Sequence, residues 1–133
     1  MAGSEFQSVA RAQVQAQGAV LRHGHVTDVA IDEVVRATTS DGEEVTADYL
    51  ILSEGKNPVL ARSLGLAEEE SAAITVGGDF RSSNDRVYVI GRSARPTRSQ
   101  AIISAGAGAI AALDILAREA GEDVQDWDTP PKD

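Results

Sequence analysis

The chain has 133 residues, which suits one domain, and its formal net charge of −9 argues against binding to nucleic-acid backbones. It contains no cysteine, which excludes disulfides, thiolate nucleophiles and cysteine-ligated metals within the chain. Aromatic residues make up 4% of the sequence, too few for a surface on which bases stack.

Residues 4–18 are predicted to form the first helix. Ser4 can cap its N-terminus, Gln7 completes a capping box three residues later, and Gly18 ends it. Three short β segments are expected next, over 19–22, 25–31 and 34–39.

Asp41-Gly42 is a strong turn signal, after which residues 43–46 can pair back on the preceding strand. Apolar and polar residues alternate through this region. The pattern predicts a half-exposed antiparallel meander.

Two compact apolar runs, 49–52 and 87–90, are typical of buried parallel strands. Between them we expect a helical turn over 59–64 closed by Gly65, and a solvated acidic loop at 68–70. A short strand over 74–76 follows, and pairing resumes at 80–81.

Residues 97–120 form the main predicted helix, and Gly121 ends it. The predicted fold is therefore α/β, a small parallel sheet with an antiparallel meander and a long C-terminal helix. We place one domain at 4–121 and a polar tail at 122–133. In such sheets ligands bind beyond the carboxyl ends of the strands.

Gly106 and Gly108 match the spacing G-x-G-x-x-A of a dinucleotide-binding turn. The context differs, because that turn should follow a strand directly and these glycines fall within the predicted helix. Close packing of a glycine-rich helix face is the favoured interpretation.

His23 and His25 could approach a metal, but no third ligand is evident, so no metal site is expected.

Arg92, Arg95 and Arg98 lie between a strand end and a helix start, where donors favour anions. They could contact a phosphate or carboxylate, or pair with the chain's own acidic residues. The two interpretations carry equal weight. The sequence assigns no catalytic residue, since it has no G-x-S-x-G elbow and no carboxylate pair with a spacing that specifies acid–base work.

Residues 46–55 resemble the strand and turn that precede the flavin in the thioredoxin reductase family of FAD and pyridine-nucleotide oxidoreductases. The similarity continues through Asn57-Pro58 and 64–66, and then through 74–76, 81–83 and 87–91. The small-residue helix 105–116 completes it. Roughly residues 5–120 are covered.

The resemblance implies a partial FAD-binding, Rossmann-like domain. It matches only the second part of the flavin domain: no glycine-rich turn is found before residue 4, and no NADPH domain or Cys-x-x-Cys is present. In the family the strand matching 87–91 ends in Gly-Asp, whose Asp holds the ribityl and phosphate portion of FAD. Here Arg92 stands in that place. The residues that the resemblance assigns to FAD are Gly55, Gly91, Arg92, Arg98, Ser99, Gln100 and Ala101.

Two functions follow. The first is a degenerate domain without catalytic activity as this chain, acting as an assembly or binding module; the second is an FAD-binding oxidoreductase domain. Disulfide reduction by this chain is excluded because it has no cysteine. Without the missing strands, the apolar edges and faces of 49–52 and 87–90 should be exposed, which predicts self-association or a partner chain. A nucleotide or anion binder using Arg92, Arg95 and Arg98 is a third, weaker possibility.

The acidic composition, with nearly all its basic residues Arg, is typical of a high-salt cytoplasm, and a GC-rich genome gives a similar bias. Neither a signal peptide nor an apolar run near 18 residues is evident. We therefore expect a cytoplasmic location without membrane contact.

Overall fold

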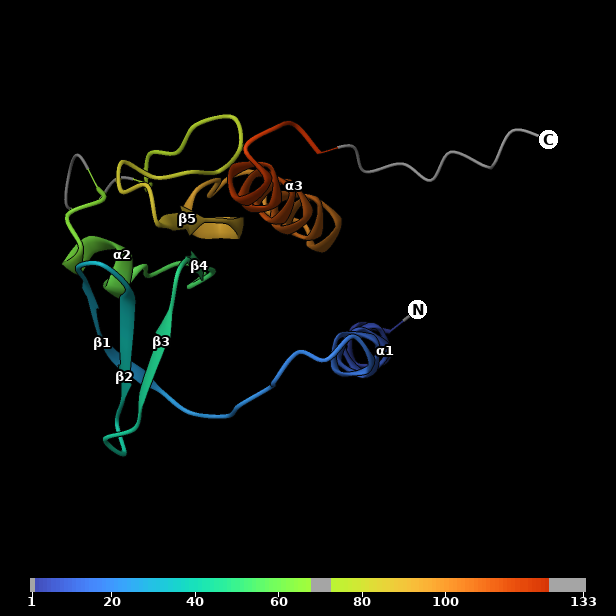
Figure 1. Ribbon diagram of the computed structural model, residues 1–133. Helices are drawn as coiled ribbons and strands as arrows, with labels where there is room; N and C mark the ends of the chain where they lie inside the picture. Colours follow the sequence, from blue (N-terminus) through green and yellow to red (C-terminus); the bar gives the residue numbers. More distant parts are fainter. Residues whose placement is uncertain (1, 68–72, 125–133) are drawn as a thin grey trace.

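The computed structural model describes residues 2–67 and 73–124. It has the predicted α/β architecture, with a three-stranded antiparallel sheet, a two-stranded parallel sheet and a long C-terminal helix (Figure 1). In chain order the elements are α1 (Gly3–Ala16), β1 (Val26–Ile31), β2 (Val35–Thr39), β3 (Glu44–Ala47), β4 (Leu50–Leu52), α2 (Val59–Ser63), β5 (Val87–Val89), the 3₁₀ turn η1 (Gly91–Ser93) and α3 (Ala101–Ala120).

The antiparallel meander is confirmed. β1 pairs with β2 and β2 with β3, with Val35 opposite Ala47 in the second pair. Gly42 in the predicted turn has φ 86°, a left-handed conformation that glycine adopts without a Cβ penalty. An irregularity between Val26 and Asp28 shifts the register of β1.

The predicted parallel pair is also confirmed, because β4 and β5 pair with Leu50 opposite Val87 and Leu52 opposite Val89. The expected exposure of 87–90 is wrong, since Val87, Tyr88 and Val89 have no exposed surface. Arg81 bridges to Tyr88 on the open edge of β5, and α3 packs over the strand. In β4 the expectation holds for Ile51, which is 40% exposed.

The apolar core lies between the parallel pair, α2 and the loops around them. Its buried members are Leu52, Ala61, Leu66, Ile74, Val87 and Val89. It therefore holds the carboxyl ends of β4 and β5 in place.

The ends of two helices differ from the prediction. α1 begins at Gly3 after Ala2, with no side-chain cap, so the predicted Ser4–Gln7 capping box is wrong: Ser4 already lies inside the helix. α3 begins at Ala101 rather than 97, because Gln100 is extended with ψ 154°. Gly121 ends α3 in the left-handed conformation, as predicted.

The predicted strands 19–22 and 74–76 do not form. The Ala19 N–H donates to the carbonyl of Val14 in α1, and the Ile74 N–H donates to the carbonyl of Ser93 in η1. These bonds join the two segments to helical turns and not to a neighbouring strand. Pairing at 80–81 is reduced to the single bridge at Arg81. The acidic loop 68–70 and tail residues 125–133 lie outside the described residues.

α1 stands away from the two sheets and α3, at the end of a segment without helix or strand (Figure 1). None of its residues is buried. The meander extends from the part of the molecule that holds the parallel pair, and the core lies around that pair (Figure 1).

By length and composition, α3 is long and apolar enough to cross a membrane. The expectation that no apolar run approaches 18 residues was therefore wrong. The core helix of a soluble protein can have the same length and composition. Asp114, two-thirds along the helix, pairs with Arg81 of the domain, which places that face of α3 against protein.

Candidate functional site at the carboxyl ends of the parallel strands

The carboxyl ends of β4 and β5 lie side by side, as a parallel pair requires. Ile90 donates its N–H to the carbonyl of Leu52 at 3.0 Å, and the Ser93 hydroxyl donates to the Gly55 carbonyl at 3.0 Å. The two turns that leave the strands are thereby joined, and the predicted residues Gly55, Gly91 and Arg92 share one edge.

Gly91 is a close-approach position. It has φ 69°, and a Cβ built there would lie 3.3 Å from the Ser53 hydroxyl and 3.6 Å from the Ser104 hydroxyl of α3. Gly55 also has positive φ, 74°, but a Cβ there would meet nothing within 4 Å. Conformation alone therefore favours glycine at 55, whereas conformation and space both favour it at 91.

Glu54 has a structural role at this edge. Its carboxylate accepts hydrogen bonds from the N–H groups of Leu60 at 2.8 Å and Ala61 at 3.1 Å, at the start of α2. These donors would otherwise have no helical partner. The position thus anchors α2, a role that the sequence analysis did not assign.

The three arginines after β5 are exposed, and none takes part in an ion pair within 2–67 and 73–124. Arg95 lies over the ring of Phe80 at 5.2 Å from the centroid. Phe80 is buried although its φ is 64°. Pairing of these arginines with the chain's own carboxylates is therefore not seen among the described residues.

Ser99, Gln100 and Ala101 lead into α3. The Gln100 carbonyl accepts from Ser104 N–H at 3.0 Å, and no side chain caps the helix. Since Ser104 also faces Gly91, the start of α3 lies next to the carboxyl end of β5. The predicted cofactor residues of 98–101 and of 91–92 are thus neighbours in space.

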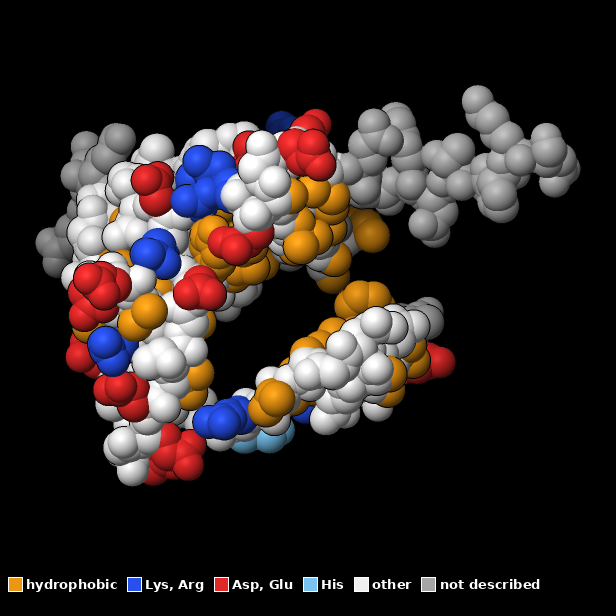
Figure 2. Space-filling view, viewed as in Figure 1, with side chains coloured by type: hydrophobic (Ala, Val, Ile, Leu, Met, Phe, Trp, Pro, Cys, Tyr) orange, Lys and Arg blue, Asp and Glu red, His pale blue; other side chains and the backbone are white. Residues whose placement is uncertain are grey.

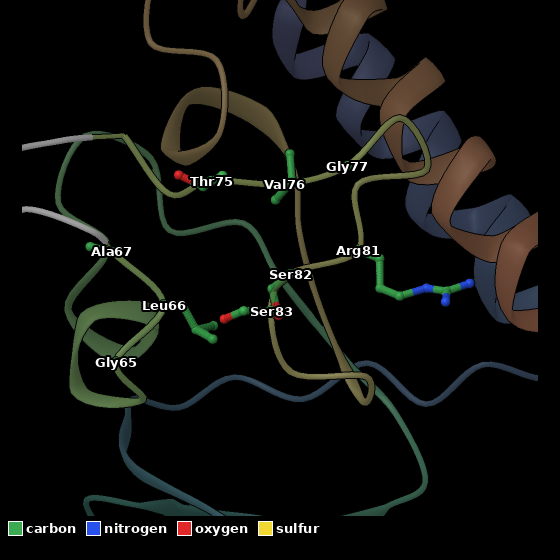
Figure 3. Close-up of a pocket in the computed structure, with 9 residues that line it drawn as sticks. All are labelled: Gly65, Leu66, Ala67, Thr75, Val76, Gly77, Arg81, Ser82 and Ser83. Atoms are coloured by element: carbon green, nitrogen blue, oxygen red, sulfur yellow. The ribbon is translucent and has the colours of Figure 1, made fainter.

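Two hollows open near this region. One, of about 620 Å³, is lined by the end of β4, the start of α2 and residues 24–27, and includes Ser53 and Glu54. The other, of about 480 Å³, lies among residues 65–67, 75–77 and 81–83 (Figure 3). In that view the Arg81 side chain extends away from the hollow towards a helix, where its partner is Asp114.

A partly buried polar cluster that sequence reasoning missed joins β5 to α3. The Tyr88 hydroxyl donates to Asp114 at 2.5 Å, Arg81 donates to the same carboxylate through two nitrogens, and Arg118 donates to the Tyr88 oxygen at 3.1 Å. A signal was available, because Asp114 is the only charged residue between positions 101 and 117.

Electrostatics favour the charged state of Asp114. Burial raises its pKa, but the hydrogen bonds from Tyr88 and Arg81 outweigh burial and leave the pKa below its usual value. The hydrogen bond to Glu119 raises the pKa of Tyr49, at the outer end of the cluster. These groups therefore hold β5 and α3 together.

Close packing, the role predicted for the two glycines of α3, is confirmed for one of them. Gly106 and Gly108 lie inside the helix and follow no strand, which rules out the dinucleotide turn. A Cβ on Gly108 would touch Ile90 at 3.6 Å, whereas Gly106 faces open space.

His23 and His25 belong to no group of three potential metal ligands in the part of the chain that the structure describes.

Comparison with solved structures shows the fold. A thioredoxin reductase from Gloeobacter violaceus is similar with a TM-score of 0.77 and 16% identity, over 96% of this chain and 81% of that chain. A ferredoxin-flavin thioredoxin reductase from Clostridium acetobutylicum has 23% identity and a TM-score of 0.40, and this chain spans 34% of its length. No curated protein sequence matches this chain.

The family model for pyridine nucleotide-disulphide oxidoreductase matches residues 1–109 of the 133. The match takes in both strand ends of the candidate site and the first turns of α3. With the fold of a thioredoxin reductase flavin domain, the chain belongs to the pyridine nucleotide-disulphide oxidoreductase family.

Proposed function

We propose that this chain is a flavin-domain module without catalytic activity of its own, which acts by assembling with another polypeptide. One observation carries the proposal: of the exposed residues of α3, only Glu119 has a polar side chain. We call the exposed apolar side of the helix the outer arc of α3. Its large members are Ile102, Ile103, Ile110 and Leu116.

The solvent-facing side of a helix normally carries polar and charged residues, and an apolar side is normally covered. Here Ala107 and Ala111 on the inner side are buried, and the outer arc is exposed. Ile102 is 78% exposed and Leu116 54% exposed. Covering a large aliphatic side chain contributes roughly 1.5–3 kcal/mol, so a partner seated here would gain substantially.

The lack of catalytic activity is proposed from the chemistry of the chain. It has no cysteine to supply a dithiol, and Glu54, at the turn after β4, has its carboxylate engaged by α2. Arg92 can only donate hydrogen bonds, so it cannot accept those that ribityl hydroxyls donate to an Asp.

An FAD-binding oxidoreductase domain is the second candidate. It is favoured by the arginines at the strand edge and by the uncapped start of α3, which together suit an anionic group such as a phosphate. The residues fit this part of the cofactor. FAD would be held by Gly55, Gly91, Arg92, Arg98, Ser99, Gln100 and Ala101. The flavin, when bound, would supply hydride transfer, and these residues would orient it.

The two candidates separate in one experiment. The purified chain is mixed with FAD in high salt and passed through gel filtration with light scattering and visible absorbance. A colourless particle larger than one chain supports the assembly role. Flavin absorbance that co-elutes, and that is lost in Arg92→Gln and Arg98→Gln but kept in Arg11→Gln on α1, favours the FAD role. A colourless monomer at all concentrations contradicts the FAD role and restricts the assembly role to a different polypeptide.

A cytoplasmic location, and the absence of contact with nucleic acid or membrane, remain proposals. The surface charge of the chain, net −9, supports them because it opposes binding to phosphate backbones and anionic lipids.

A further inference from the structure

A positive region lies on this otherwise acidic chain. Residues 87–113 contain no aspartate or glutamate, although the chain has 21 acidic residues. Arg92, Arg95 and Arg98 lie in this stretch, are exposed, and form no ion pair among the described residues. We call these three residues the arginine surface. Over the antiparallel sheet the charges are mixed instead: Figure 2 shows basic side chains beside acidic ones there, and Arg36 pairs with two carboxylates.

Backbone hydrogen bonds fix the spacing of the arginine surface. The N–H of Arg95 donates to the Gly91 carbonyl at 2.9 Å, and the N–H of Arg98 donates to the Arg95 carbonyl at 3.3 Å. The Arg95 guanidinium lies over the ring of the buried Phe80, 5.2 Å from its centroid, and this cation–π attraction orders the side chain. Arg95 therefore loses less conformational entropy when a partner binds it.

The first turn of α3 adds an apolar side chain beside the arginines. Ile102 follows Arg98 closely in the chain and is 78% exposed. Neither of the two hollows near the strand ends is lined by Ile102 or by the arginine surface. Small molecules normally bind in concave pockets, whereas protein interfaces combine apolar residues with arginine. These residues therefore favour a polypeptide as the ligand.

Charge complementarity identifies the kind of polypeptide. We infer that an acidic segment of a different protein docks here, with its carboxylates on the arginine surface and an apolar side chain against Ile102. The net charge of −9 repels such a segment from most of the chain, which restricts where it can bind. A short segment brings a few carboxylates without the net charge of a whole acidic domain, so it fits better than a second copy of this chain. The inference rests on the proposed assembly role and names the chemistry of the partner.

A peptide titration followed by the amide NMR shifts of the isotope-labelled chain tests the inference. The probe is a synthetic peptide of alternating Glu and Leu, and the control peptide carries Gln in place of every Glu. One variant removes the arginine surface through Arg92→Gln, Arg95→Gln and Arg98→Gln. The matched control makes the same change of net charge elsewhere, through Arg11→Gln, Arg22→Gln and Arg36→Gln.

The expected result is a saturable shift of amides within residues 91–103 with the Glu peptide and none with the Gln peptide. The affinity should fall about tenfold when the arginine surface is removed and stay nearly unchanged in the matched control. Equal losses in the two variants would overturn the inference, because net charge alone would then explain the binding. No shift, or shifts outside residues 91–103, would also overturn it.

Two further measurements separate other ligands of the same surface. The same shifts with inorganic phosphate at an equal concentration of charge would indicate a site for small anions, and shifts that grow with protein concentration alone would indicate a second copy of this chain. Either result overturns the inference. Each of these failures leaves the assembly role standing, because gel filtration tests that role independently through the mass of the particle.

Discussion

Replacing Asp114 tests whether the polar cluster between β5 and α3 holds the helix in place. Asp114→Asn keeps the shape of the side chain and removes its charge. The Asp114 side chain is 12% exposed and accepts from Arg81 and from the fully buried Tyr88. Hydrogen bonds to a charged group each contribute about 1.5–3 kcal/mol, and a buried pair that loses one partner costs about 3–5 kcal/mol.

The cost here should fall below the sum of these values. Arg81 is 36% exposed and can be rehydrated, and an Asn oxygen still accepts one bond. We expect a loss of about 2–3 kcal/mol in the free energy of unfolding. With a urea slope of about 1.5 kcal/mol per molar, the midpoint should fall by roughly 1–2 M.

Urea unfolding followed by circular dichroism provides the assay. The control is Glu119→Gln, which alters an exposed hydrogen bond from the Tyr49 hydroxyl and should leave the midpoint nearly unchanged. If Asp114→Asn lies within about 0.5 kcal/mol of the unmodified chain, the cluster contributes nothing measurable and the reasoning fails.

Three further outcomes are expected. Gly55→Ala should lower the free energy of unfolding by about 1–2 kcal/mol, because its backbone is left-handed. Gly91→Ala should lower it further, because the new Cβ also meets Ser53. Equal losses of stability in thermal melts would contradict the contact with Ser53. Glu54→Ala should lower the free energy of unfolding by about 1 kcal/mol, because it removes the cap of α2. Glu54→Asp tests whether a shorter carboxylate still reaches the N–H of Leu60. If neither variant changes the thermal melt, Glu54 does not stabilise α2. Because the pKa of Asp114 is lowered in the folded state, its contribution is present above the unfolded value near 4 and is lost as pH falls through the folded pKa, so the stability difference between the unmodified chain and Asp114→Asn should shrink in acid.

The parallel pair was predictable because its signal is local. Residues 49–52 and 87–90 are short, apolar and bounded by turn residues, and such runs identify buried strands. The neighbouring segments 19–22 and 74–76 carry a similar pattern, yet they form no strand. Whether a segment pairs depends on which chain lies beside it, and that information is not in the segment itself.

The candidate site was predictable in position and less so in detail. Carboxyl ends of parallel strands meet at one edge, so Gly55 and Gly91 had to be neighbours once the pairing was known. The Glu54 bonds to α2 and the contact between Gly91 and Ser53 were not predictable, because both depend on side-chain placement across the turn. The start of α3 was misplaced because nothing in 97–100 marks an extended Gln100.

The two sides of α3 show why its outer arc demands an explanation that its inner side does not. On the inner side, Ala107 and Ala111 are buried, and Asp114 and Arg118 hold the helix against β5 through hydrogen bonds with Tyr88. In a chain with 21 acidic residues, a solvent-facing helix surface would be expected to carry several of them. The exposed surface of α3 carries only one, Glu119, and Ile102 on the outer arc is the most exposed large apolar residue of the helix. A surface with the composition of a core is stable in water only when something covers it, so the arc indicates a partner even though α3 is already anchored on its other side.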